Sequence, residues 1–287
     1  MAELGISAEA FAAAIDRLCA RRDHPVVVKL GGSAMEDPVS TEACLKSVAA
    51  LNKLRVPLVL VHGGGKAIDR AMAEAGLTPK KVAGRRYTDE ATLKIVVHVL
   101  KDEINLDLEA KLRDLSAAAF SVQDVLFGER LTLTGEDGQP VDLGRVGKIT
   151  GVDSRVLKAF LRDGELPIIP SLARDSDGKW LNINADTAAS AVAGALKADK
   201  AIFLTDTPGV LRDQNDPNSL IPLLNEREAR ELITSGVIDG GMVPKVEACF
   251  EALDAGARTA LILDGRVPYS LLDVFLHNTF TGTAITR

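Results

Sequence analysis

The sequence contains only three cysteines in 287 residues, and their positions fit neither a disulfide framework nor a metal site. Cys19, Cys44 and Cys249 are odd in number, widely separated and without the short spacings of zinc ligands. No apolar run approaches the roughly 20 residues that a membrane-spanning helix needs. The first ten residues also lack the basic start and the apolar centre of a signal peptide. We therefore expect reduced thiols in a cytoplasmic protein that does not enter a membrane.

Positively charged residues are also fewer than negatively charged ones. The chain has 34 lysines and arginines against 40 aspartates and glutamates, a formal net charge of −6. The basic residues are scattered, and the only arginine pairs are at 21–22 and 85–86. This balance argues against a nucleic-acid-binding or membrane-surface protein, because both need a basic stripe. If the ligands are small anions, a few local cations must overcome an acidic background.

The familiar nucleotide and hydrolase motifs are absent. Around Lys66, a P-loop would need glycine where the chain has Leu60 and serine or threonine where it has Ala67. The last glycine of a dinucleotide-binding fingerprint falls on Ile68. No Ser-His-Asp arrangement is recognisable, and the four histidines (His24, His62, His98 and His277) have no ligand spacing. A nucleotide would have to be bound without either motif.

Short β-branched runs alternate with longer segments of helical period, which predicts an α/β fold with a mostly parallel sheet covered by helices. The expected buried strands are residues 26–30, 58–61, 167–170, 201–205 and 259–263. The expected helices are residues 41–54, 67–75, 89–115, 154–162, 185–196, 226–234 and 243–255.

Other segments have a different pattern. Turn dipeptides within 131–149 and 171–183 predict antiparallel hairpins that project over one site in a mixed sheet. Residues 7–22 have apolar positions at three- and four-residue spacing, so we expect a short amphipathic helix. That helix packs either on its own domain or on another subunit as an oligomerisation arm. We divide the chain into an N-terminal extension (1–24), an N-terminal lobe (25–178) and a C-terminal lobe (179–287).

Two of the expected strands end in glycines. The first runs through Lys29 to Gly31-Gly32-Ser33, and the second leads from His62 into the glycines at 63–65 and then Lys66. Glycine allows backbone N–H groups to approach an anion closely, and a following helix adds its positive N-terminal end. Each motif alone fits a plain tight turn equally well. Their combination with Lys29 favours an anion site.

Charged and amide side chains recur at other turns. Arg86 precedes an expected helix, where its planar fork suits a carboxylate, although a solvated surface arginine is the commoner case. Asn182 and Asn184 alternate on an extended segment, so both should face one side. Asp186 follows at a helix start, either as an N-cap or as an acid that orients lysines or a metal. Lys245 lies in an apolar helical segment, which favours a functional anion partner.

These motifs together resemble the N-acetylglutamate kinases of the amino acid kinase family. The stretches VKLGGSAM, VHGGGKAID, GRRYTDE, NINADTAA, LTDTPGV and GGMVPKVEACFEAL occur in family order across residues 26–253, and ILDGRVPYSLL continues the match. The resemblance covers about nine-tenths of the chain, and it implies a three-layer α/β/α sandwich with β-hairpins over the substrate site. The implied reaction is phosphorylation of the side-chain carboxylate of N-acetyl-L-glutamate by MgATP, in arginine biosynthesis.

The resemblance also implies roles for individual residues. Lys29 and Lys245 would stabilise the transferring phosphoryl group, with Asp186 orienting both lysines. Gly64, Gly65, Arg86 and Asn182 in the N-terminal half of the site would bind the acetylated amino acid. ATP would be bound mainly by the C-terminal lobe, with Mg²⁺ held through its phosphates and no direct metal ligand from the protein. The nucleotide-binding residues would be Gly32, Asp206, Gly209, Leu211, Val237 and Asp239.

The chain departs from this pattern near its C-terminus. Relatives that are inhibited by arginine have a histidine where this chain has Tyr269, and a glutamate where it has Val274. Arginine feedback therefore stays open, as does the choice between a dimer and a hexamer. Two rival functions are a kinase of the same fold for another N-acylated amino dicarboxylate, of aminoadipate type, and a non-catalytic small-molecule sensor.

Overall fold

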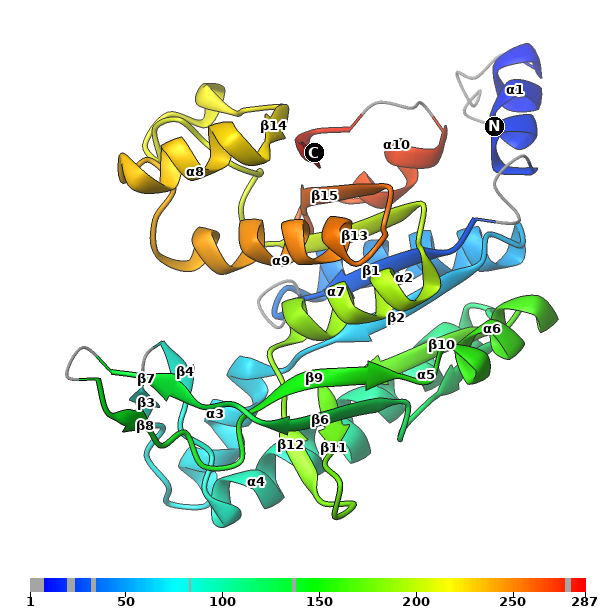
Figure 1. Cartoon of the computed structure of the whole chain (residues 1–287). Helices are drawn as coiled ribbons and strands as arrows, with labels where there is room; N and C mark the ends of the chain where they lie inside the picture. Colours follow the sequence, from blue (N-terminus) through cyan, green and yellow to red (C-terminus); the bar gives the residue numbers. More distant parts are fainter. Residues whose placement is uncertain (1–7, 20–23, 32–34, 83, 136–137, 277–279) are drawn as a thin grey trace.

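The computed structural model of the chain describes residues 8–19, 24–31, 35–82, 84–135, 138–276 and 280–287 (Figure 1). Its centre is an eight-stranded sheet in the order β14-β16-β15-β13-β1-β2-β10-β5. All neighbouring strands are parallel except the pair β15–β16. The strands are β1 (Val26–Leu30), β2 (Leu58–His62), β5 (Ala119–Ser121), β10 (Leu166–Pro170), β13 (Lys200–Thr205), β14 (Leu223–Asn225), β15 (Thr259–Asp264) and β16 (Gly282–Thr286).

Helices cover both faces of this sheet, as the alternation of side chains in β1 requires. Val27 packs in a core with α7 (Ala185–Leu196) and α9 (Val243–Asp254). Val28 packs in a second core with α2 (Pro38–Lys53), α5 (Asn105–Asp114) and α10 (Ser270–Leu276). The other helices are α1 (Ala8–Cys19), α3 (Gly65–Glu74), α4 (Glu90–Val97), α6 (Ser154–Asp163) and α8 (Glu226–Thr234). The predicted α/β sandwich is confirmed.

The long helix expected at 89–115 is continuous but not uniform. Between α4 and α5, residues His98–Ile104 form a π-helix, a wider turn that helices adopt mostly in short pieces and often at functional sites. Leu100 and Ile104 from this turn face the glycines that follow β2. The predicted helix is therefore confirmed, and its middle widens into a π-helix next to the site.

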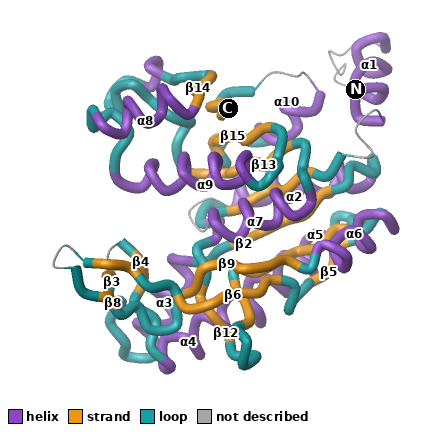
Figure 2. The backbone as a smooth tube through the Cα atoms, viewed as in Figure 1, coloured by secondary structure: helices purple, strands orange, loops and turns teal. Residues whose placement is uncertain are grey.

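The hairpins form sheets of their own and do not extend the main sheet (Figure 2). The hairpin expected within 171–183 is confirmed as β11 (Leu172–Arg174) and β12 (Trp180–Asn182). In 131–149 only β7 (Leu133–Thr134) and β8 (Pro140–Val141) pair with each other. The following strand, β9 (Gly147–Val152), pairs instead with β6 (Leu126–Arg130), giving a four-stranded sheet β12-β11-β6-β9. A small third sheet joins β3 (Lys81–Val82) to β4 (Arg85–Arg86).

The N-terminal helix packs on its own chain through part of its surface. Within the described part of α1, Ala14 and Leu18 are buried, and the helix contacts α10. These contacts favour the first of the two alternatives for this helix. The expected lobe boundary at 178–179 falls inside the turn between β11 and β12, where Gly178 N donates to Asp175 O.

The described parts of the chain were compared with two expectations from the sequence, the absence of a membrane-spanning helix and the presence of reduced thiols. None of the helices there is long and apolar enough to cross a bilayer. Cys44 and Cys249 are free and buried. Burial raises the pKa of the Cys44 thiol to about 12, and burial together with the nearby Asp186 carboxylate raises that of Cys249. Both thiols therefore stay protonated and unreactive at neutral pH.

Candidate active site

A cavity of about 910 Å³ opens where β1, β2 and β10 end. Lys29, Gly63 and Ser171 line it from these strand ends. The hairpin sheet contributes Gly147 and Asn182, and the small third sheet and the start of α9 complete the wall. The carboxyl ends of parallel strands are the usual place for ligands in α/β folds. The cavity is therefore the candidate active site.

An ion pair lies on the floor of the cavity. Lys29 Nζ is 2.7 Å from Asp186 Oδ1, and the two side chains are only 9% and 12% exposed. Alternation in β1 directs Lys29 to the same face as Val27, which is the face that α7 covers. Asp186 Oδ1 makes no aligned hydrogen bond within the described residues, so the contact with Lys29 is electrostatic. Burial in low dielectric makes such a pair strongly interdependent.

Asn184, and not Asp186, caps α7. Its side-chain oxygen accepts from Asp186 N at 2.8 Å and from Thr187 N at 3.2 Å. The capping alternative for Asp186 is thus wrong, because the cap lies two residues earlier and leaves the Asp186 carboxylate free to face Lys29. Asn182 also lines the cavity, and its side-chain nitrogen donates to Thr88 Oγ1 at 3.0 Å.

The three glycines after β2 have different surroundings. A Cβ on Gly63 would lie 3.0 Å from Ala185 Cβ, and one on Gly64 would lie 2.5 Å from Ile104 Cδ1. A Cβ on Gly65 would meet nothing within 4 Å. Packing within the protein explains the first two glycines, and only Gly65 leaves open space toward the cavity. Gly64 is also the N-cap of α3, so that helix begins without a side-chain cap, and its positive end faces the cavity.

His62 is fully buried beside these glycines. Its Nδ1 lies 3.2 Å from Gly63 O and its Nε2 lies 2.9 Å from Asn105 Oδ1. Burial lowers the pKa of His62 to about 4, although both hydrogen bonds act in the opposite direction. The ring is therefore neutral at physiological pH. It connects β2 to the helix that carries the π-turn.

Arg86 has more protein partners than the sequence suggested. Its Nη1 lies 2.5 Å from Asp69 Oδ1, and its Nη2 donates to Gly65 O at 3.0 Å. The side chain is 13% exposed, so the alternative of a solvated surface arginine is excluded. The neighbouring Arg85 is half-buried and lines the cavity together with Glu251, whose pKa burial raises and the Arg85 charge lowers in part. From the sequence, only Arg86 was predicted to bind substrate, although Arg85 lies directly beside it.

Lys245 lies in the first turn of α9 and does not itself line the cavity, although Val243 and Pro244 beside it do. It is half-buried, and its Nζ donates to Gly241 O at 2.9 Å. Gly240 and Gly241, from the 3₁₀ turn that leads into α9, line the cavity. Within the described residues Asp186 therefore contacts Lys29, whereas Lys245 bonds to its own helix start.

The residues predicted to bind nucleotide lie apart from the cavity lining. Asp206 follows β13, and Gly209 has a left-handed backbone packed against Thr283. Asp239 accepts from Gln214 Nε2 at 2.5 Å, next to the glycines that line the cavity. The remaining two, Leu211 and Val237, are held by backbone pairing with Leu220 and Leu232. Gly32 lies outside the described residues.

The fold and this cavity define a member of a known class. A model of the amino acid kinase family matches residues 24–264, and the chain belongs to this family. An acetylglutamate kinase of Prochlorococcus marinus is 40% identical over 262 residues, covering 91% of this chain and 84% of that protein. An acetylglutamate kinase of Akkermansia muciniphila is 38% identical and covers 96% of this chain and 93% of its own length.

Solved structures agree with this assignment of the fold. The crystal structure of smu.665 from Streptococcus mutans UA159 is 32% identical with a TM-score of 0.75, covering 92% of this chain and 99% of that one. An N-acetylglutamate synthase from Neisseria gonorrhoeae is 26% identical with a TM-score of 0.84, covering 97% of this chain and 63% of that chain. A carbamate kinase of Giardia lamblia, 20% identical with a TM-score of 0.64, shares the fold.

Proposed function

We propose that this protein uses ATP to phosphorylate the side-chain carboxylate of N-acetyl-L-glutamate in arginine biosynthesis. The product is an acyl phosphate. The single observation that carries the proposal is the buried Lys29–Asp186 pair on the floor of a cavity that the glycine-rich start of α3 also faces. The acetylglutamate kinases that match most of the chain support the same reaction.

The chemistry fits a site without a general base. A carboxylate acceptor has an ordinary pKa near 4.3, so it is already ionised at pH 7. The difficulty is to bring this anion against the negatively charged γ-phosphate, and catalysis must come from positioning and charge stabilisation. We assign that task to Lys29 and Lys245, with Asp186 orienting Lys29. Lys245 would exchange its bond to Gly241 O for one to phosphate.

We assign the acceptor to the side of the cavity formed by Gly64, Gly65, Arg86 and Asn182. Gly65 leaves space for the substrate, and Asn182 presents an amide beside it. Arg86 positions the Gly65 carbonyl and offers its remaining N–H groups to the α-carboxylate. Arg85 supplies a second guanidinium in the same wall.

We assign the adenine nucleotide to the C-terminal lobe, near Asp206, Gly209, Leu211, Val237 and Asp239, with Gly32 near the phosphates. The uncapped glycine turn before α9 would receive phosphate. In the described residues no group of three or more acidic, histidine or cysteine side chains could hold a metal ion. We therefore propose that Mg²⁺ binds through the ATP phosphates, where it neutralises the charge that the transfer develops.

We also propose that residues 25–178 bind the amino acid and residues 179–287 bind ATP. The protein would form a homo-oligomer, either a dimer or a hexamer, and would be located in the cytoplasm. The cores on both sides of the sheet mix residues of both lobes. The lobes would thus share one rigid floor while their loops carry different ligands.

An acyl-phosphate trap tests the proposed reaction. Purified protein with MgATP, N-acetyl-L-glutamate and hydroxylamine should give a coloured hydroxamate, and N-acetyl-L-2-aminoadipate should give much less. A larger yield with the aminoadipate would favour the rival acceptor. No hydroxamate with either acceptor would indicate a non-catalytic protein.

A further inference from the structure

The cavity wall that carries Asn182 depends on a charged side chain that does not line the cavity. Arg145 precedes β9, and its side chain is only 5% exposed. Burying a guanidinium is costly unless all of its polar partners are supplied. The partners of the Arg145 guanidinium therefore identify the segments that this residue connects.

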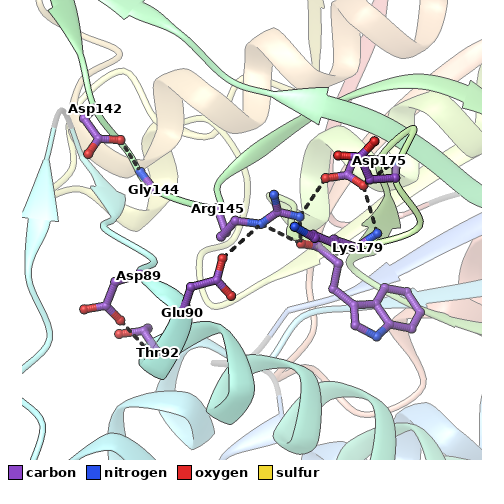
Figure 3. Close-up of polar contacts among 10 residues, drawn as sticks. Asp89, Glu90, Thr92, Asp142, Gly144, Arg145, Asp175 and Lys179 are labelled. Carbon is purple, nitrogen blue, oxygen red and sulfur yellow. Dashed lines mark hydrogen bonds and ion pairs between the residues drawn. The ribbon is translucent and has the colours of Figure 1, made fainter.

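All close side-chain contacts of Arg145 go to the β11–β12 hairpin. Nη2 lies 2.8 Å from Asp175 Oδ2 and also donates to Trp180 O at 2.8 Å, and Nε donates to the same carbonyl at 3.2 Å. Glu90, at the start of α4, lies 4.0 Å from Nε on the opposite side, as Figure 3 shows. Arg145 thus lies between the hairpin and α4.

Asp175 completes this junction. Its other oxygen, Oδ1, accepts from Asp177 N at 3.0 Å and from Lys179 N at 2.8 Å, which closes the hairpin turn. Burial disfavours the charged carboxylate, but the hydrogen bonds from Arg145 and from these backbone groups outweigh it and lower the pKa of Asp175. The pair is therefore charged at neutral pH.

The backbone of Arg145 connects the same junction to the substrate side of the cavity. Its N–H donates to Thr88 O at 2.6 Å, and its carbonyl accepts from Asn182 N at 2.9 Å. Thr88 is fully buried and receives the Asn182 side chain, while its own hydroxyl donates to Arg86 O. One residue therefore ties the strand that carries Asn182 to the segment before α4 that carries both Arg86 and Thr88.

We propose that Arg145 is a positioning residue for the acceptor half of the site. Its guanidinium fixes Trp180 and Asp175, which sets the position of β12 and hence of the Asn182 amide. The residue acts through Asn182 and the segment before α4, and it does not touch the substrate itself. The inference deepens the proposed function and rests on it.

Steady-state kinetics of Arg145→Met test the proposal, with Arg174→Met as the matched control. Arg174 holds the same hairpin through Asp124, Gly178 O and the Trp180 ring, but its guanidinium is not bonded to the Trp180 carbonyl or to Asp175, the groups through which Arg145 fixes β12. We expect Arg145→Met to raise the KM for N-acetyl-L-glutamate by about tenfold or more. The KM for ATP and kcat should change less than about twofold, and Arg174→Met should leave all three near their native values. Arg145→Lys, which keeps the charge but can reach fewer partners, should lie between.

The experiment also distinguishes failure of the proposed function from failure of the positioning role of Arg145. If the native protein forms no acyl phosphate, the proposed function fails. If the native protein is active but Arg145→Met raises both KM values together, or behaves like Arg174→Met, the positioning role is overturned. Should Arg145→Met not fold, Arg145→Lys and calorimetric binding of N-acetyl-L-glutamate give the same comparison. An unchanged dissociation constant in Arg145→Lys would then contradict the proposal.

Discussion

At the scale of single residues, two lysines of the site form ion pairs that differ in burial. Lys29 faces a buried carboxylate, whereas Lys148, which also lines the cavity, forms an ion pair with Glu129 that is more than half exposed. Exposed pairs contribute little, and buried ones depend strongly on geometry. Substitutions at these two lysines should therefore have very different consequences.

The substitution Lys29→Arg should distinguish the contribution of the Lys29 charge to stability from the contribution of its ammonium position to catalysis. The guanidinium preserves the ion pair with Asp186 and hence most of the stability, but it cannot place a compact ammonium against the phosphoryl group. We expect kcat to fall by about 100-fold or more, while the thermal midpoint changes little. Lys148→Met, measured beside it, should keep near-native turnover. Normal turnover in Lys29→Arg would contradict the proposed role of Lys29.

Gly64 and Gly65 offer a matched pair of substitutions. Gly64→Ala forces a methyl group to within 2.5 Å of Ile104 Cδ1 and should destabilise the fold by about 1–3 kcal/mol, as overpacking does. Gly65→Ala meets no atom within 4 Å and should leave the stability unchanged while raising the KM for the acceptor. Urea unfolding and kinetics measure the two effects. Ile104→Val removes the clashing carbon atom, so it should partly restore Gly64→Ala.

Among the elements, the helix from α4 through the π-turn to α5 is held to β2 by the buried ring of His62. The folded-state pKa of about 4 lies below the ordinary value of 6.5. Between these values the unfolded chain binds a proton that the folded chain does not. Stability is therefore complete above about pH 6.5 and is lost as the pH falls toward 4, by on the order of 3 kcal/mol.

Urea unfolding at several pH values checks this expectation. His62→Asn should show a shallower loss of unfolding free energy over that window than the native protein does. His98→Gln is the control, because His98 is exposed and its side chain lies on the outer surface of the same helix. An identical pH slope in His62→Asn and the native protein would exclude His62 as the cause.

Elements that are buried throughout were predictable from sequence. All five positions of β1 are buried, and its bounds agree with the predicted 26–30. The capped α7 likewise begins and ends where its pattern predicts. The short strands β5, β14 and β16 were not predicted, because they lie toward the ends of the sheet and carry partly exposed residues.

The missed features of the site depend on contacts that are distant in sequence. Arg86 is 17 residues from Asp69, and Arg145 is 30 residues from Asp175 and 35 from Trp180. No local pattern shows that a guanidinium in a Gly-Arg-Val turn will be buried, because its partners arrive only when the β11–β12 hairpin docks. By contrast, Lys29, Asp186 and the glycines lie at strand and helix ends, where local patterns carry the information.

At the scale of the whole molecule, the two main sheets share one hydrophobic core. Leu126, Ala173 and Leu181 of the hairpin sheet pack in the same cluster as Val192 of α7 and Val246 of α9. Sharing a core makes the hairpin sheet unfold together with the main sheet.

The single tryptophan makes it possible to test whether the hairpin sheet and the main sheet unfold together. Trp180 lies in the hairpin sheet, and its ring is 3.3 Å from the Arg174 guanidinium carbon. Its fluorescence and far-ultraviolet circular dichroism should give coincident transitions in urea. A fluorescence change at clearly lower urea would show that the hairpin sheet is an independently unfolding unit. Arg174→Lys, as a control for the direct effect of the cation on the fluorophore, should change the signal amplitude more than the midpoint.

The position of β1 has a consequence for how the protein is made. This strand is the first of the sheet to leave the ribosome, and β2 at 58–62 can cover one of its edges soon afterwards. Its other edge pairs with β13, which is synthesised only at residues 200–205. Throughout that interval the nascent chain presents an open edge of valines and leucine, the kind of edge on which polypeptides aggregate. Chains arrested before residue 200 should therefore depend on chaperones more than the full-length chain does.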